Sequence, residues 1–272
     1  MVTRGTTTRI LLALWAMLLA VVAPAQAADR IVSLAPSLTE MVHDLGMADR
    51  LAGRLEGGQL SPSLQRIPVV GIAGQLDMER LLQLQPDLVL YWPGSIGIQQ
   101  LHKLEQLQIP VFHARATTMQ ELAAQYEQLG ERLGAAEQGR KLGAQIRQRL
   151  QTLQQTHAGK PAVALFYQLW DKPMFTLGGG QIVSDALSYC GAHNIFADLE
   201  TPAPQVNLEM VMARNPQLVL LSRDRLRDSW PASIQLPMLV VPDDGLDRPS
   251  LQMLDALEQL CQAIDDFRSN RI

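Results

Sequence analysis

The chain is poor in cysteine, in aromatic residues and in positive charge. It has two cysteines, aromatic residues make up 5% of it, and 23 Lys and Arg stand against 27 Asp and Glu. A net charge of −4 argues against nucleic-acid binding, which requires a basic face. The five histidines lack the spacing of metal ligands, and no P-loop or nucleophile elbow occurs. We therefore expect no nucleic-acid partner, no bound metal and no enzymatic activity.

Long apolar runs are also absent beyond the first 22 residues. Arg4 and Arg9 precede the apolar run 10–22, which is short for a membrane span, and Ala25-Gln26-Ala27 has the A-x-A pattern of a cleavage site. We predict that residues 1–27 are a signal peptide, cut after Ala27, and that the protein is periplasmic. No cysteine stands directly after the cut, where a lipid would be attached, so a free protein is favoured over a lipid-anchored one. The mature chain has 21 basic and 27 acidic residues, a net charge of −6.

The two cysteines, Cys190 and Cys261, are expected to form a disulfide in an oxidising compartment. They would close a loop of about 71 residues, which chain-entropy arguments value at roughly 4 kcal/mol. A metal site would need more ligands nearby. A catalytic thiol would need surroundings that lower its pKa, which the apolar neighbour Leu260 does not provide. The disulfide is favoured over both alternatives.

Short apolar strands alternate with helical segments in two blocks of the chain. We predict strands at residues 30–34, 88–92, 109–112, 163–167, 218–221 and 238–241. Ser37 is expected to cap the helix after the first strand, with Glu40 in the capping-box position. Strands separated by helices predict parallel sheets with crossover connections, and therefore an α/β fold.

A long helical segment separates the two blocks. Residues 118–157 are rich in Gln, Glu, Ala, Leu and Arg, and Gly134 divides them, which leaves 135–155 as one helix about 30 Å long. Such a helix could be an ordinary surface helix of one domain, but its place between the blocks favours a connector. We predict an N-terminal lobe at 28–133, a linking helix at 134–158 and a C-terminal lobe at 159–272.

The two blocks also contain a shared local pattern. Asp77-Met78-Glu79 precedes Pro86 by the same interval at which Asn207-Leu208-Glu209 precedes Pro216. In each case the pattern predicts a capped helix that leads through a turn into a core strand, with Asp77 and Asn207 as N-caps. Glu79 and Glu209 would then occupy equivalent places, one in each lobe. Both are equally explained as acidic first-turn residues that the helix dipole favours.

The few aromatic residues gather at the ends of predicted strands. Tyr91 and Trp92 end one strand, Tyr167 and Trp170 end another, and Phe175 follows closely. Ligands of open α/β sheets bind beyond the carboxyl ends of the strands, so these side chains are expected to line a cleft between the lobes. Core packing is the alternative for each of them. As a group they favour a flat, largely apolar ligand.

Several segments together resemble the periplasmic vitamin B12-binding proteins, which are solute-binding proteins of ABC importers. The resemblance covers nearly all of the predicted mature chain. The segments that carry it are Arg30–Ser37, Met78–Arg80, Pro86–Val89, Pro173–Thr176, Cys190-Gly191, Asn194–Phe196, Pro204–Val206 with Glu209, and Gln259–Cys261.

The resemblance implies a class III periplasmic binding protein: two Rossmann-like lobes with central parallel sheets, joined by one long backbone helix. It implies a monomer that holds a corrinoid between its lobes as transported ligand, with no cofactor. It also implies a disulfide between Cys190 and Cys261. Glu79 and Glu209 match the glutamates that dock onto arginines of the membrane permease, and such charge pairs orient an encounter.

The resemblance also suggests ligand contacts. Pro36 lies in a matching segment, and Asp244, Asp247 and Arg248 stand where the family has polar ligand-facing residues, although they could equally form a helix-start cluster. Ala73 and Ala203 replace tryptophans of the family. Either Trp92 and Trp170 partly rebuild the aromatic clamp, or the pocket is wider and serves a related corrinoid, or the ligand has changed.

Two other functions compete with a corrinoid receptor. A receptor for haem or for an iron-siderophore chelate would use Tyr91 or Tyr167 as an iron ligand. A metal-dependent enzyme on the same two-lobed scaffold would require a bound metal, and the sequence favours it least.

Overall fold

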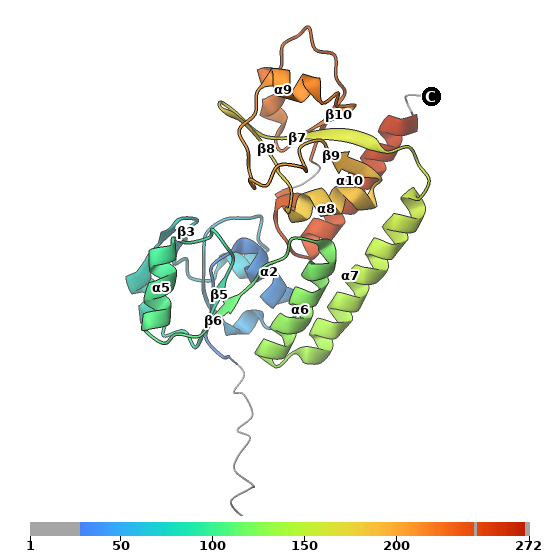
Figure 1. Ribbon diagram of the computed structural model, residues 1–272. Helices are drawn as coiled ribbons and strands as arrows, with labels where there is room; N and C mark the ends of the chain where they lie inside the picture. Colours follow the sequence, from blue (N-terminus) through green and yellow to red (C-terminus); the bar gives the residue numbers. More distant parts are fainter. Residues whose placement is uncertain (1–27, 242–243, 270–272) are drawn as a thin grey trace, which may run out of the picture.

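The structure of the protein, a computed structural model, describes residues 28–241 and 244–269 (Figure 1). The predicted signal peptide, residues 1–27, and its cleavage site lie outside the described residues. Figure 1 shows two lobes, each with its own central sheet, and one long helix that runs along the side of the molecule between them. The predicted α/β class is therefore confirmed. Within the described residues no helix is long and apolar enough to cross a membrane.

The N-terminal lobe is built on a four-stranded parallel sheet with the order β2-β1-β5-β6. Its strands are β1 (Ile31–Ser33), β2 (Leu51–Arg54), β5 (Leu88–Tyr91) and β6 (Val111–His113). Its other elements are α2 (Pro36–Asp44), η1 (Ala48–Arg50), α3 (Pro62–Gln65), the hairpin β3 (Gly71–Ile72) and β4 (Gln75–Leu76), α4 (Met78–Gln83) and α5 (Ile98–Gln106). Strand β1 is buried throughout, as expected for a parallel strand covered on both faces.

The C-terminal lobe is built on a five-stranded sheet in which β11, β10, β7 and β8 follow one another and β9 pairs with β7. Its strands are β7 (Val163–Asp171), β8 (Met174–Thr176), β9 (Ala192–Asn194), β10 (Leu218–Leu221) and β11 (Met238–Val240). Only β8 runs antiparallel to its neighbour among the described strands of this sheet. Its helices are α8 (Ile182–Tyr189), α9 (Leu208–Ala213), η2 (Asp224–Ser229), η3 (Asp244–Asp247) and α10 (Leu251–Ser269).

Two antiparallel helices, α6 (Met119–Leu133) and α7 (Ala136–His157), lie between the two sheets in the chain. Gly134 ends α6 in a left-handed conformation, with φ at 74°, which only glycine adopts readily. The two helices lie so close together that a Cβ at Gly139 would be 2.6 Å from the Tyr126 carbonyl oxygen. Helix α7 has 22 residues, a length of about 33 Å, and leads into β7 of the C-terminal lobe.

The two lobes share a hydrophobic core beneath the linking helices. One cluster of buried side chains includes residues of both sheets, of α6 and α7, and of the C-terminal helix α10. Tyr126 of α6 is fully buried; its hydroxyl donates to Asp44 Oδ2 at 2.7 Å and accepts a hydrogen bond from the Leu251 backbone N–H at 2.9 Å. The start of α10 is therefore anchored on the N-terminal lobe. Burial and the nearby Asp44 carboxylate raise the pKa of Tyr126 well above its ordinary value.

The predicted cap of the first helix is wrong. Helix α2 begins at Pro36, its N-cap is Ala35, and no side chain caps it. Ser37 and Glu40 lie inside the helix and are buried. Proline is favoured at the first helical position, because its fixed φ suits the helix and its missing N–H would have no partner there. Pro36 therefore sets the start of α2, and Glu40 is available for another role.

Candidate functional site

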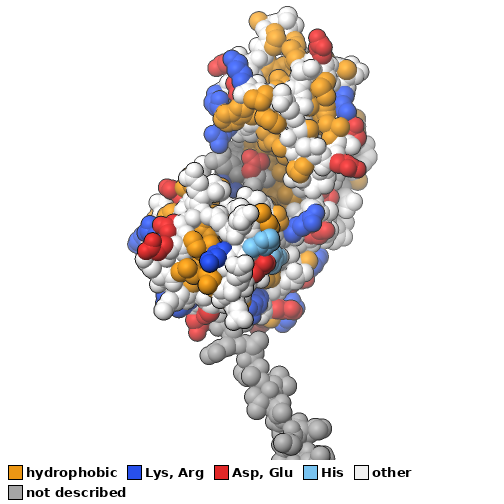
Figure 2. All heavy atoms as spheres, turned by 60° about the vertical axis from the view of Figure 1, so that its left-hand side comes forward, with side chains coloured by type: hydrophobic (Ala, Val, Ile, Leu, Met, Phe, Trp, Pro, Cys, Tyr) orange, Lys and Arg blue, Asp and Glu red, His pale blue; other side chains and the backbone are white. Residues whose placement is uncertain are grey.

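A cleft between the lobes has two adjoining compartments of about 440 and 450 Å³. Figure 2 shows the surface hollowed between the upper and lower lobes. Trp92, Asp247 and Pro249 line both compartments, so they form the boundary between them.

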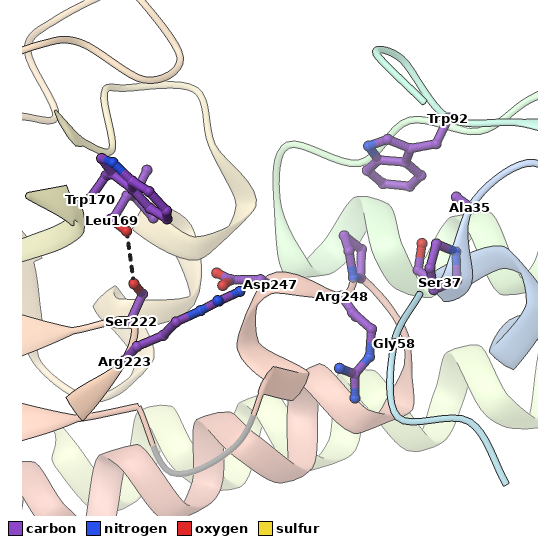
Figure 3. Close-up of a pocket in the computed structure, with 12 residues that line it drawn as sticks. Ala35, Ser37, Gly58, Trp92, Leu169, Trp170, Ser222, Arg223, Asp247 and Arg248 are labelled. Carbon is purple, nitrogen blue, oxygen red and sulfur yellow. Dashed lines mark hydrogen bonds between the residues drawn. The ribbon is translucent and has the colours of Figure 1, made fainter. Parts of the chain in front are cut away.

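The first compartment is lined by residues from both lobes and from the η3–α10 connection. They are Ala35, Pro36, Ser37, Gly58, Trp92, Leu169, Trp170, Ser222, Arg223, Asp247, Arg248 and Pro249. Figure 3 shows Trp92 and Trp170 on opposite sides of the cleft, with Asp247 and Arg248 between them. Trp170 is 44% exposed, so much of its ring is free to contact a ligand. The two tryptophans provide facing aromatic walls.

The second compartment is also lined by residues from both lobes. Its residues are Trp92, Pro93, Arg115, Ala116, Thr117, Leu177, Gly180, Gln181, Ile182, Val183, Pro202, Asp247 and Pro249. Arg115 is exposed and comes from the N-terminal lobe, whereas Leu177, Ile182 and Val183 come from the C-terminal lobe. An apolar wall therefore faces a guanidinium across this compartment.

The lining residues follow the carboxyl ends of the strands in both sheets. Ala35 follows β1, Trp92 follows β5, Arg115 follows β6, and Ser222 with Arg223 follows β10. Parallel strands deliver the segments at their carboxyl ends to one edge of the sheet, and ligands of such sheets bind at that edge. The two edges face each other across the cleft.

A buried ion pair joins the lobes at the base of the first compartment. Arg248 Nε donates to Glu40 Oε1 at 2.9 Å, and the Ser250 hydroxyl donates to Glu40 Oε2. The side chains of Arg248 and Glu40 are 9% and 2% exposed. Burial raises the pKa of Glu40 above its ordinary value, although Ser250 and Arg248 each oppose the shift. Glu40 therefore fixes the position of a cation that lines the cleft.

Trp170 is supported from outside the cleft. The guanidinium of Arg225 lies 4.5 Å from the centre of the Trp170 ring, a cation–π contact, and Arg225 also lies 3.8 Å from Asp171 Oδ1. Ser222 Oγ donates to the backbone oxygen of Leu169 at 3.0 Å, which ties β10 to the strand that carries Trp170 (Figure 3). These contacts hold the ring at the edge of the cleft.

The structure brings together five of the nine residues predicted to face a ligand. Pro36, Trp92, Trp170, Asp247 and Arg248 line the first compartment. Asp244 begins η3, and its side chain lies outside the described residues.

The other three predicted aromatics line neither compartment. Tyr91 packs edge-on against His113, and Phe175 pairs with Gln205 at the edge of the sheet. Tyr167 is fully buried, and its hydroxyl donates to Oδ1 of the cleft residue Asp247 at 3.1 Å. It is buried because β7 is covered on both faces, so its predicted contact with a ligand does not fit its position.

Among the polar side chains of the cleft, Arg223, Ser222 and Arg115 were not predicted from the sequence. Arg223 and Ser222 come directly after the predicted strand 218–221, which is the signal that could have found them. Arg115 follows β6 in the same way. Ala73 and Ala203, where tryptophans were expected, are exposed and line neither compartment.

The two acidic helix starts are confirmed in both lobes. Asp77 Oδ1 accepts the Arg80 N–H at 2.9 Å, and Asn207 Oδ1 accepts the Met210 N–H at 2.8 Å. Glu79 and Glu209 lie in the first turns of α4 and α9, and both are exposed.

The predicted disulfide is also confirmed. Cys190 and Cys261 are bonded with a Cα–Cα distance of 4.8 Å, and the bond joins the end of α8 to α10. No group of three or more His, Cys, Asp or Glu that could hold a metal ion occurs among the described residues.

Known proteins resemble this chain in sequence and in structure. A model of the periplasmic binding protein family matches residues 31–234. The chain is 35% identical over 244 residues to a vitamin B12-binding protein of Yersinia pestis (strain Pestoides F). The aligned residues make up 88% of this chain and 87% of that protein. The structure of the periplasmic vitamin B12-binding protein BtuF of Vibrio cholerae has a TM-score of 0.78 and 33% identity, and covers 86% of this chain and 96% of that one.

The fold is shared more widely. The haem-binding protein RhuT from Roseiflexus sp. RS-1, in apo form, has a TM-score of 0.77 at 20% identity, and covers 89% of this chain and 100% of that one. At this identity the likeness concerns the fold alone. The family match and the B12-binding relatives identify a periplasmic solute-binding protein rather than an enzyme, as expected. The chain belongs to the periplasmic binding protein family.

Proposed function

We propose that the protein binds a corrinoid such as vitamin B12 in the cleft between its lobes and delivers it to an ABC permease. The observation that carries this proposal is the pair of facing tryptophans, Trp92 and Trp170, in a chain 35% identical to a vitamin B12-binding protein. A corrin ring is large and flat, so it suits two aromatic walls. The corrinoid is cargo, and the proposal requires no cofactor.

The chemistry of the lining favours a corrinoid over haem. None of the described residues that line the two compartments is a His, Tyr, Cys or Met, the usual protein ligands of haem iron. A corrinoid needs no such ligand from the protein, because its cobalt can keep the axial ligands that it brings with it. Tyr91 and Tyr167, the two tyrosines expected to ligate iron, line neither compartment.

Calorimetric titration of the chain from residue 28 onward tests the ligand. We expect one-to-one binding of cyanocobalamin, and Kd at least tenfold higher in Trp92→Ala and in Trp170→Ala, which corresponds to about 1.4 kcal/mol. Leu107→Ala, an exposed apolar side chain outside both compartments, is the control and should bind normally. Haemin should give no Soret shift. Failure of cyanocobalamin to bind at micromolar concentration would refute the proposal.

We also propose that Glu79 and Glu209 dock onto arginines of the permease. Both carboxylates are exposed at equivalent helix starts, one on each lobe, so they can meet a partner that has two basic sites. Charge reversal, Glu79→Lys with Glu209→Lys, should abolish uptake in cells and leave corrinoid binding intact. Glu131→Lys, also exposed, is the matched control. Normal uptake in the double variant would remove the docking role.

The remaining boundaries are proposed on the same basis. The signal peptide would be residues 1–27, the lobes 28–133 and 159–272, and the link 134–158. The mass of the exported protein will show whether the cut follows Ala27. A monomeric elution volume is expected, because each chain contains both walls of the cleft.

A further inference from the structure

Two guanidinium groups in the cleft have no counter-charge bound to them. Arg115 lines the second compartment and Arg223 the first, and among the described residues neither side chain forms an ion pair or a hydrogen bond. Arg248 differs from them, because Glu40 neutralises it. An unpaired cation in a binding cleft of an otherwise acidic protein indicates that the ligand brings the negative charge.

The surroundings of Arg115 distinguish it from Arg223. In Figure 3 Arg223 extends towards Asp247, an exposed carboxylate that lines both compartments. The nearest acid along the chain from Arg115 is Glu121, whose Oε2 already accepts the Thr117 N–H at 2.6 Å and the Thr117 hydroxyl at 2.8 Å. These hydrogen bonds from Thr117 are the larger causes of the lowered pKa of Glu121, and the charge of Arg115 helps to lower it, but the Arg115 and Glu121 side chains form no ion pair among the described residues.

The second compartment also has room for more than an ion. Ala116, Leu177, Ile182, Val183 and Pro202 give it apolar walls, and its volume is about 450 Å³. A substituent that fits such a space combines a flat apolar ring with an anionic oxygen group. An inorganic anion alone would leave these walls in contact with water.

We propose that Arg115 binds an anionic substituent of the ligand and makes the protein selective for corrinoids that carry one. This inference rests on the proposed corrinoid function and extends it. Cobalamin has a nucleotide loop in which a phosphodiester is attached to a benzimidazole base, whereas cobinamide has the same ring and lacks that nucleotide. Trp92 separates the two compartments, so the corrin ring lies in the first and the loop reaches the second.

Calorimetric titration of the chain from residue 28 onward with cyanocobalamin and with dicyanocobinamide tests this selectivity. The wild type should bind cyanocobalamin at least tenfold more tightly. Arg115→Gln should remove most of this difference by weakening cyanocobalamin binding and leaving dicyanocobinamide binding unchanged. Arg115→Lys should keep part of it, because the charge remains. Arg223→Gln is the control, and the ratio of the two affinities should stay as in the wild type.

Other results of these titrations would overturn either the role of Arg115 or the corrinoid function itself. Equal binding of the two corrinoids by the wild type, or an equal loss for both in Arg115→Gln, would overturn the role of Arg115 while the corrinoid function stands. A loss of selectivity in Arg223→Gln and not in Arg115→Gln would also overturn it. Binding of neither corrinoid by the wild type would refute the proposed function, and this inference with it. Circular dichroism of each variant shows that it is folded.

Discussion

Replacement of Arg248 by methionine should destabilise the protein strongly. Methionine keeps much of the length of the side chain and removes its charge, so Glu40 loses its partner across 208 residues of sequence. Glu40 is 2% exposed and would keep only the hydrogen bond from Ser250 among the partners described above. A buried carboxylate without a counter-charge has a large desolvation cost.

The size of the effect follows from this burial. Removal of one partner of a buried ion pair costs about 3–5 kcal/mol of unfolding free energy. For a chain of this size, about 1 kcal/mol corresponds to roughly 2–4 °C, so the melting temperature should fall by roughly 10 °C. The double replacement Glu40→Met with Arg248→Met removes both charges. It should recover at least about 2 kcal/mol of this loss, since apolar residues of similar volume often replace a buried pair without cost.

The destabilisation should depend on pH in a known direction. The pKa of Glu40 is raised in the folded wild type, so the folded state holds its proton more tightly than the unfolded state does. Stability is therefore lost as pH rises from the ordinary carboxyl range through the raised pKa. Without Arg248 the pKa of Glu40 rises further. The difference between Arg248→Met and wild type should therefore be smallest at pH 4 and largest at pH 7.5.

Urea denaturation of the four proteins at both pH values measures these effects. Glu40→Met is the fourth member of the cycle and leaves Arg248 without a counter-charge. An unfolding free energy of Arg248→Met within about 1 kcal/mol of the wild type at pH 7.5 would contradict a stabilising role of this ion pair. A double variant less stable than Arg248→Met would contradict it as well.

Three further predictions concern stability. Reduction of the disulfide should lower the unfolding free energy by roughly 4 kcal/mol, as urea curves with and without reductant will show, and coincident curves would contradict this. Asp77→Ala and Asn207→Ala should each cost about 1 kcal/mol, because each leaves a helix N–H without its cap; a cost in only one lobe would separate the two caps. Gly178→Ala should cost about 1–3 kcal/mol or more, since its Cβ would lie 1.9 Å from the Thr201 carbonyl oxygen. Gly97→Ala, whose Cβ has no neighbour closer than 3.8 Å, is the matched control for thermal melting.

Local patterns in the sequence were sufficient to predict much of the fold. The strand 218–221 was predicted with the bounds that β10 has, and the caps Asp77 and Asn207 lie where the pattern placed them. These features depend on residues a few positions apart. The division at Gly134 was predicted in the same way, because a glycine in a left-handed conformation ends a helix.

The wrong predictions concern residues whose surroundings depend on parts of the chain that are distant in sequence. Ser37 and Glu40 match the capping-box pattern, but Glu40 forms a buried ion pair instead, and its partner Arg248 lies in the other lobe. The burial of Tyr167 could not be predicted, because β7 is covered on both faces and an alternating pattern is absent. Trp170, three residues later, is exposed only because the strand has passed the edge of the core. The sequence alone shows neither that both faces of β7 are covered nor where along the strand the core ends.

The contact between Glu40 and Arg248 has a consequence for how the protein reaches its folded state. The carboxylate is near the beginning of the chain, and its partner precedes the last helix, α10, which also binds Tyr126 of the N-terminal lobe. Contacts so distant in sequence form late, because the intervening chain must first be ordered. An N-terminal half without the rest of the chain would have to bury a lone carboxylate to complete its core. We expect it to remain only partly folded, and the whole molecule to become stable when its final 25 or so residues arrive.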